Sequence, residues 1–419
     1  MKKVLIICDL FPPAFGPRMG YLTKYIRAYG WEPIVLTETV KDESAFSFLT
    51  DICPVTRINF YTAKGKYLRK LQWLFLFLLD FFFDYKDFRM VQKAHKMYKK
   101  QPFDLVLCST FRTFPLKAAR KVAQKYNLPF VVDLRDIIEQ YSGNEFISHD
   151  ISSWGNLGRS FTKYFRQKNL QTRNEVLTTA AHVTTISPWH VEVLQAFNRN
   201  VSLIYNGYDP ELFYPEQPVT RHFVITYTGR ILSTEMRDPG LFMQALSILL
   251  KNKKLSPCDC KVHWYVDAAS WDIIYKEAEK EDILSYMVFK GYVPANQIPH
   301  VLNNSSVLLL LTNKSDQKGP KGTMTTKFFE SLAVEKPILC VRSDESYLAA
   351  AIDETNAGLA ATKAEEVSAF LMHHYEEWKV QGYTSSPVNR EAIQQYSRKN
   401  QAKEFAVLFN QLIDNRKNN

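Results

Sequence analysis

The strongest candidate for chemistry is the segment 319–333, where a loop of glycines and threonines runs into a helical pattern. Such a loop leaves backbone N–H groups, among them those of Thr325 and Thr326, at the positive end of a helix dipole, where anions bind. Lys327 adds a positive charge, and Glu330 follows about one turn later, where its carboxylate could accept hydrogen bonds from ribose hydroxyls. The segment therefore predicts a nucleotide site. The alternative is that Lys327 and Glu330 only pair on a solvated helix face.

A second basic group follows a strand predicted at 223–228. Gly229 and Arg230 come directly after this strand, and Arg237 stands just before the turn at 238–240 that opens a helix. Two guanidinium groups at a strand end and a helix start could neutralise a diphosphate without a metal ion. Arginines that are simply solvated in a loop are the alternative.

Two further groups lie in the first half of the chain. After the first strand, Gly16 lets the backbone approach a ligand closely and Arg18 supplies charge beside a helix start, although no GxGxxG dinucleotide motif is present. At the end of a buried strand, Asp133 or Asp136 could position an acceptor hydroxyl while Arg135 holds a phosphate. The alternatives are a plain loop and a surface ion pair that caps the next helix.

These groups all follow short apolar runs that alternate with helical patterns, as in parallel sheets covered by helices on both faces. Because the rhythm stops at turn-forming residues and then restarts, we predict an α/β protein with two doubly wound domains, 1–205 and 223–395, a hinge at 206–222, and a C-terminal helix, 396–419, that packs on the first domain. Ligands bind beyond the carboxyl ends of such strands, so the two domains are expected to face a cleft. The predicted strands are 4–8, 33–37, 105–109, 130–134, 183–187, 201–205, 223–228, 262–266, 288–290, 307–311 and 338–341.

Composition narrows the function. The 419 residues carry a net charge of +10, which favours an anionic partner, but no arginine-rich helix or zinc finger points to nucleic acid. Cys258, Cys260 and His263 resemble half of a zinc site without a second pair of ligands, so no metal is expected. His373 and His374 are interpreted as surface residues. The start of the chain lacks a signal-peptide pattern, and we expect a cytosolic protein.

Taken in order, these motifs are similar to those of family-4 retaining glycosyltransferases of bacterial surface-polysaccharide biosynthesis, over nearly the whole chain. The resemblance implies a GT-B fold, a UDP- or GDP-sugar donor bound mainly by the second domain, retention of anomeric configuration, and no cofactor or metal. The matching elements are 11–13, 30–33, 35–37, 185–187, 206–209, Phe213, Pro215, 227–229, 290–293 and 327–337.

The resemblance also assigns roles. Glu330 is similar to the family's ribose-binding glutamate, Lys327 and Arg237 to the bases that hold the diphosphate, and Tyr292 with Val293 to the backbone that receives the nucleobase. Many members carry another glutamate eight positions before the ribose-binding one, where this chain has glycine. The usual histidine after the strand at 130–134 is also absent, with two aspartates there instead.

We therefore expect a glycosyltransferase that moves a sugar to a saccharide acceptor, which is expected to be lipid-linked. Lys327 and Arg237 would stabilise the departing diphosphate and Asp136 would act on the acceptor side. A nucleotide-sugar epimerase with the same fold and a non-catalytic nucleotide-sugar-binding protein are the alternatives.

A membrane contact is predicted at 64–83. Four basic residues precede a dense apolar run there, and the uninterrupted part, seven residues, is far too short to span a bilayer. Such a helix either packs into the first domain or lies in the membrane surface beside anionic headgroups. We predict the second arrangement, peripheral on the inner face of the cytoplasmic membrane.

Overall fold

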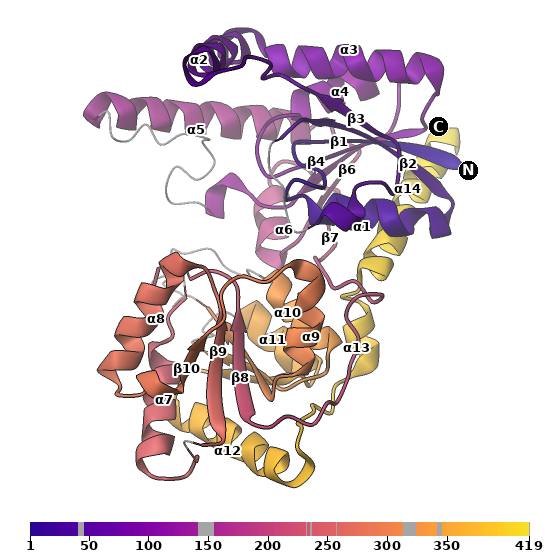
Figure 1. Cartoon of the computed structure of the whole chain (residues 1–419). Coiled ribbons are helices and arrows are strands. Elements are labelled where there is room, and N and C mark those ends of the chain that lie inside the picture. The colour runs from indigo at the N-terminus through magenta and orange to yellow at the C-terminus, as the bar shows by residue number, and fades with distance from the viewer. Residues whose placement is uncertain are drawn as a thin grey trace. The chain divides into compact units, whose positions relative to one another are not determined.

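A computed structural model of the chain describes residues 1–40, 46–140, 155–231, 233–234, 237–256, 258–312, 324–341 and 346–418. The chain divides into two compact units (Figure 1). Unit 1 comprises Met1–Tyr205 and Gln401–Asn419, and unit 2 comprises Asn206–Asn400. Each unit has its own parallel sheet and its own hydrophobic core.

Unit 1 is built on a seven-stranded parallel sheet in the order β3-β2-β1-β4-β5-β6-β7. Its central strands are continuous apolar runs buried on both faces, as expected where helices cover both sides. The strands are β1 (Lys2–Cys8), β2 (Trp31–Glu38), β3 (Val55–Ile58), β4 (Leu105–Thr110), β5 (Phe130–Leu134), β6 (His182–Thr185) and β7 (Val201–Leu203).

Helices cover both faces of this sheet (Figure 1). One face packs on α1 (Pro17–Tyr25) and on α14 (Arg398–Asn418), whose side chains Ala402, Phe405 and Phe409 join a cluster with Val4 and Ile6 of β1. The other face packs on the remaining helices of the unit. These are α2 (Lys66–Phe83), α3 (Tyr85–Lys100), α4 (Leu116–Lys125), α5 (Gly155–Leu177) and α6 (Pro188–Leu194).

Unit 2 repeats the design with a six-stranded parallel sheet in the order β10-β9-β8-β11-β12-β13. Its strands are β8 (Phe223–Thr228), β9 (Cys260–Tyr265), β10 (Met287–Phe289), β11 (Val307–Leu311), β12 (Ile338–Val341) and β13 (Gly358–Ala361). Its helices are α7 (Gly240–Lys251), α8 (Ala268–Lys280), α9 (Ile298–Asn303), α10 (Thr326–Ala333), α11 (Ser346–Glu354), α12 (Ala364–Gln381) and α13 (Arg390–Gln394). The largest core lies between the sheet and α7, α8 and α12.

The predicted α/β class with two doubly wound parallel sheets is confirmed. The eleven apolar runs coincide with strands to within a few residues, while β3 and β13 were not predicted. Both are four-residue edge strands, Val-Thr-Arg-Ile and Gly-Leu-Ala-Ala, too short and too mixed to stand out as apolar runs. None of the described helices is long and apolar enough to cross a bilayer.

The strand order of each sheet reverses at one place. In unit 1 the chain adds strands on one side of β1 and then returns to its other side with β4, and in unit 2 the same happens at β8 and β11. Ligands of open α/β sheets bind beyond the carboxyl ends of the strands at such a switch point. A ligand site is therefore expected among the residues that follow β1 and β4 in unit 1, and β8 and β11 in unit 2.

Candidate functional site

The switch point of unit 2 brings together two groups that the sequence predicted separately. Gly229 follows β8, and α10 is the helix that comes after the neighbouring strand β11. Thr325 caps α10, its side chain accepting a hydrogen bond from the N–H of Phe328 at 3.4 Å. The N–H groups of Thr326 and Lys327, in the first turn, have no partner within the helix and are oriented to bind an anion. The preceding loop, with Gly319 and Gly322, lies outside the described residues.

The side chain of Lys327 folds back over the end of β8. Its Nζ lies 5.1 Å from the centroid of the Tyr227 ring. A Cβ added to Gly229 would stand 2.3 Å from Lys327 Cε and 2.7 Å from Nζ. A larger residue at position 229 would therefore require the end of the Lys327 side chain to move, which couples residues 229 and 327.

The electrostatic environment of Lys327 weakens its charge in the ligand-free protein. Burial, together with the nearby Arg237, lowers the pKa of Lys327 to about 7, while Glu330 acts in the opposite direction. In the described part of the chain no ion pair joins Lys327 to Glu330. The alternative reading, a Lys327–Glu330 pair on a solvated helix face, is therefore wrong. An incoming anion would restore the full positive charge of Lys327.

Glu330 is half-buried on α10 and makes no hydrogen bond to any described residue. Burial raises the pKa of Glu330 to about 7, while the positive charges of Arg398 and Lys327 lower it. Arg398 is itself buried, and its Nη1 donates to Asn206 Oδ1 at 3.2 Å. A carboxylate in this setting has both oxygens available to accept hydrogen bonds from ligand hydroxyls.

The cost of burying this carboxylate gives a pH-dependent prediction. The pKa of Glu330 rises from its ordinary value of 4.5 to about 7 in the folded protein. Burying the protonated carboxyl costs little below pH 4.5, and the free energy of unfolding falls as the pH rises through 7, because the folded protein must then bury a charge. Glu330→Gln is therefore expected to melt at a higher temperature than wild type at pH 8, and the gap should close towards pH 4.5. Calorimetry across this range checks it, and a less stable variant at pH 8 would contradict it.

The two arginines of unit 2 differ in their surroundings. Arg237 is half-buried, its Nη1 donates to the carbonyl of Arg230, and the hydroxyl of Tyr227 donates to the same carbonyl at 3.2 Å. The Arg230 side chain is 73% exposed, with Nε 3.0 Å from Asp267 Oδ2. Arg237 thus lies with Gly229 and Lys327 in one group, called the Lys327 group below. Arg230 fits the alternative of an arginine solvated in a loop.

Tyr292 and Val293 follow β10, which lies two strands from β8 in the sheet. Neighbouring strands are about 4.8 Å apart, so these residues lie at the same sheet edge but roughly 10 Å from the Lys327 group. Tyr292 is 74% exposed and Val293 is half-buried. Their backbone is accessible for a flat ring, which keeps the nucleobase assignment a prediction.

The first sheet carries its own polar group at the switch point. Asp9 follows β1, and Arg135 follows β5 and donates from Nη2 to Asp9 Oδ1 at 2.7 Å. The other Asp9 oxygen and Arg135 Nε are buried and have no hydrogen-bond partner among the described residues. Asp136 accepts a hydrogen bond from Gln140 at 2.8 Å. Gly16 packs so tightly that a Cβ would stand 2.5 Å from the carbonyl oxygen of Leu10.

Arg18 and Asp133 form a buried structural network instead of facing a ligand. Both are almost completely buried, and Arg18 donates to both Asp133 oxygens at 2.9 to 3.2 Å. Arg18 also donates to the carbonyls of Ile204 and Tyr205, both at 2.9 Å. Asp133 further accepts from Ser109 and Thr184, at 2.8 Å each. The expectation that these two residues contact an acceptor is corrected, because the fold already uses their hydrogen-bonding capacity.

Arg18→Lys tests this structural role. A lysine cannot reproduce the planar fork that bridges Asp133 and two carbonyls, so unit 1 should lose about 1–2 kcal/mol of stability. Chemical denaturation monitored by tryptophan fluorescence measures the loss. A variant with wild-type stability and weakened acceptor binding would restore the acceptor role.

Gly229→Ala tests the coupling of residues 229 and 327. Gly229 has φ +102°, and an added methyl group would displace Lys327, so turnover should fall by roughly tenfold. Gly30→Ala is the matched control, because Gly30 has φ +85° with no heavy atom within 4 Å of an added Cβ. Equal activity losses in the two variants would show that backbone strain, not the displaced lysine, is responsible.

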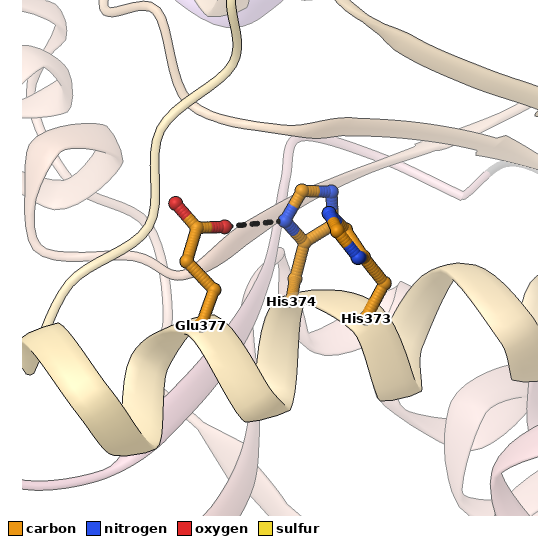
Figure 2. Close-up of side chains that lie close together, drawn as sticks. All are labelled: His373, His374 and Glu377. Atoms are coloured by element: carbon orange, nitrogen blue, oxygen red, sulfur yellow. Dashed lines mark hydrogen bonds and ion pairs between the residues drawn. The ribbon is translucent and has the colours of Figure 1, made fainter.

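One cluster of metal-ligand type occurs among the described residues, on α12 (Figure 2). His374 Nδ1 lies 2.8 Å from Glu377 Oε2, and the other oxygen of Glu377 accepts from the N–H of Ser385 at 3.1 Å. His374 is buried, so its interpretation as a surface residue is wrong, whereas His373 is exposed. The contacts attach α12 to the following loop, which gives the cluster a structural role.

Three residues near these sites were not predicted. Asp9 could have been found, because it directly follows a buried strand at the switch point, as Gly229 does in unit 2. Tyr227 is an inward-facing strand residue, and Arg398 reaches Glu330 from a distant part of the chain. Neither carries a local signal of its position.

No protein-family model and no curated protein matches the chain. Solved structures do. HepE of Anabaena in complex with UDP and glucose is 16% identical with a TM-score of 0.63, over 98% of this chain and 100% of that one. Sucrose-phosphate synthase from Thermosynechococcus elongatus is 12% identical with a TM-score of 0.60, over 99% and 100%. A glycosyltransferase from Rickettsia africae is 13% identical with a TM-score of 0.60, over 99% of each chain. At these identities the likeness establishes the fold, and the chain has the two-domain α/β architecture, GT-B, of these proteins.

Proposed function

We propose that the protein is a glycosyltransferase that moves a sugar from a nucleoside diphosphate donor to a saccharide acceptor. The observation that carries the proposal is the switch point of unit 2. There the chain places Gly229 and Arg237 after β8, and Lys327 after β11 with Glu330, which has no hydrogen-bond partner among the described residues. Positive charge, free helix N–H groups and a hydroxyl-binding carboxylate are the three features that a nucleoside diphosphate requires.

Each residue has a part in donor binding. Lys327 and Arg237, with the N–H groups of Thr325 and Thr326, would hold the diphosphate. Glu330 would accept hydrogen bonds from the ribose hydroxyls, and Tyr292 with Val293 would receive the base. The fold likeness to HepE, solved with UDP-glucose, supports a UDP-sugar as the first donor to test, with a GDP-sugar as the second.

The reaction we propose is a front-face displacement. The acceptor oxygen bonds to the anomeric carbon as the bond from that carbon to the donor phosphate oxygen breaks, on the same face. The same phosphate oxygen takes the acceptor proton. Lys327, Arg237 and the start of α10 stabilise the negative charge on the departing diphosphate, so no protein nucleophile and no metal is required. Configuration at the anomeric carbon is retained.

On the acceptor side, we propose that Arg135 and Asp136 act at the carboxyl edge of the first sheet, together with Asp9. Arg135 Nε and one Asp9 oxygen retain unused hydrogen-bonding capacity, which a saccharide hydroxyl or a phosphate could satisfy. An acceptor that carries a phosphate, as a lipid-linked saccharide does, fits the positive charge of Arg135.

The experiment is an assay for free nucleoside diphosphate with UDP- and GDP-sugars, with and without a lipid-linked saccharide, and with excess chelator. A transferase releases nucleoside diphosphate when acceptor is present and forms a larger saccharide. An epimerase changes the sugar and releases no nucleotide, and a binding protein does neither. We expect full activity in chelator, so a loss that magnesium or manganese restores would contradict the metal-free mechanism.

A further inference from the structure

We infer that α2, with the adjoining surface of α5, docks the protein on an anionic lipid bilayer. α2 is unusual because Leu76 is its one fully buried residue. Many of its other apolar side chains form an exposed stripe at spacings of three and four residues, which is one face of a helix. The most exposed members are Tyr67 at 83%, Phe82 at 68%, Leu71 at 63% and Phe75 at 61%, and the others are Leu68, Leu74 and Leu78.

The opposite side of α2 is well anchored. Trp73, Phe77 and Phe81 stack along the helix, and Phe81 stacks on Phe161 of α5 with ring centroids 6.0 Å apart. Lys168 of α5 donates to the carbonyl of Phe81 at 2.7 Å. Since these contacts fix the rotation of α2, the stripe stays exposed in the described part of the chain.

The basic residues around the stripe indicate that its partner is anionic. Lys64, Lys66 and Lys70 are exposed at the start of α2, and no acid occurs in the helix before Asp80. Next to α2, the described part of α5 exposes Leu157 and Tyr164 together with Arg159 and Lys163. Apolar side chains bordered by lysine and arginine match the boundary between acyl chains and anionic headgroups.

The main competing occupant is a second copy of this chain. In a two-fold dimer the same net-positive patch would lie on both subunits, so the two surfaces would repel each other. An anionic lipid surface has no such conflict. α2 would lie in the plane of the membrane with its stripe about 5–10 Å deep, consistent with the lack of any described helix able to cross a bilayer.

Vesicle flotation tests the inference on the full-length protein without donor, so its result does not depend on the proposed transferase activity. With vesicles of one part phosphatidylglycerol to two parts phosphatidylcholine, wild type should float. Leu71→Ser/Phe75→Ser/Phe82→Ser should lower the binding constant by roughly tenfold or more. Ile248→Ser/Tyr275→Ser/Val380→Ser, which changes exposed apolar residues of unit 2, is the matched control and should bind as wild type does.

A charge variant completes the test. Lys64→Gln/Lys66→Gln/Lys70→Gln should weaken binding to anionic vesicles by about fivefold for each lysine, and high salt should have the same effect on wild type. Circular dichroism confirms folding of each variant. Three outcomes would overturn the inference: no flotation of wild type, equal flotation of wild type and the apolar variant, or a wild-type dimer in sedimentation that the apolar variant abolishes.

Discussion

Replacing Lys327 with alanine is expected to lower the turnover number by about 10²- to 10³-fold, the usual cost of removing one group that stabilises developing charge. The charge on the departing diphosphate grows in the transition state, so turnover should fall more than donor affinity. Burial and Arg237 lower the pKa of the ligand-free Lys327 to about 7, so its charge is only partly present before the diphosphate forms. This supports a larger effect on turnover than on donor affinity. Steady-state kinetics with saturating acceptor gives both numbers.

Lys251→Ala, which removes a charge from the end of α7, is the matched control for a general effect of charge in unit 2. Lys327→Arg keeps the charge but needs more room over Gly229, so it should restore only part of the activity. A Lys327→Ala enzyme with normal turnover and only a raised Michaelis constant would place this lysine in ground-state binding alone.

Replacing Glu330 with alanine is expected to weaken nucleoside diphosphate binding by roughly ten- to a hundredfold, because hydrogen bonds to a charged group contribute about 1.5–3 kcal/mol. The carboxylate has no hydrogen-bond partner of its own among the described residues, so the loss should come from the ligand and not from a disrupted fold. Isothermal titration of wild type and variant with UDP and with GDP measures it.

The ribose itself provides the control. Wild type should bind the 2′,3′-dideoxy nucleoside diphosphate weakly, and Glu330→Ala should bind it as weakly as wild type does, because the contact is already missing. A Glu330→Ala penalty of equal size for the ribose and dideoxy ligands would mean that Glu330 acts elsewhere, through Arg398 for instance.

The fold was largely predictable from the sequence because parallel strands buried on both faces are continuous apolar runs, and those of β5, β8, β11 and β12 were located to the residue. The two missed strands lie at sheet edges, where burial is incomplete. The motif of Lys327 and Glu330 was visible because one helix turn carries both residues.

What the sequence could not supply is contact between distant segments. Nothing local distinguishes Arg18 and Asp133, which bind each other in the core, from an arginine and an aspartate that face a ligand. Similarly, the glycine at 229 could be read only as a flexible turn, while the structure shows that it makes room for Lys327. Pairings of this kind depend on the strand order, which brings the end of β8 beside the end of β11.

The most direct test of the account is a thermal-shift panel of nucleotide sugars on wild type and on Glu330→Ala. A ligand at 100 times its dissociation constant stabilises a protein by about 2.7 kcal/mol, which a melting curve resolves. A UDP- or GDP-sugar is expected to raise the melting temperature of wild type and to do so far less for Glu330→Ala. If no nucleotide sugar stabilises wild type, or if both proteins are stabilised equally, the donor site is not at the switch point of unit 2.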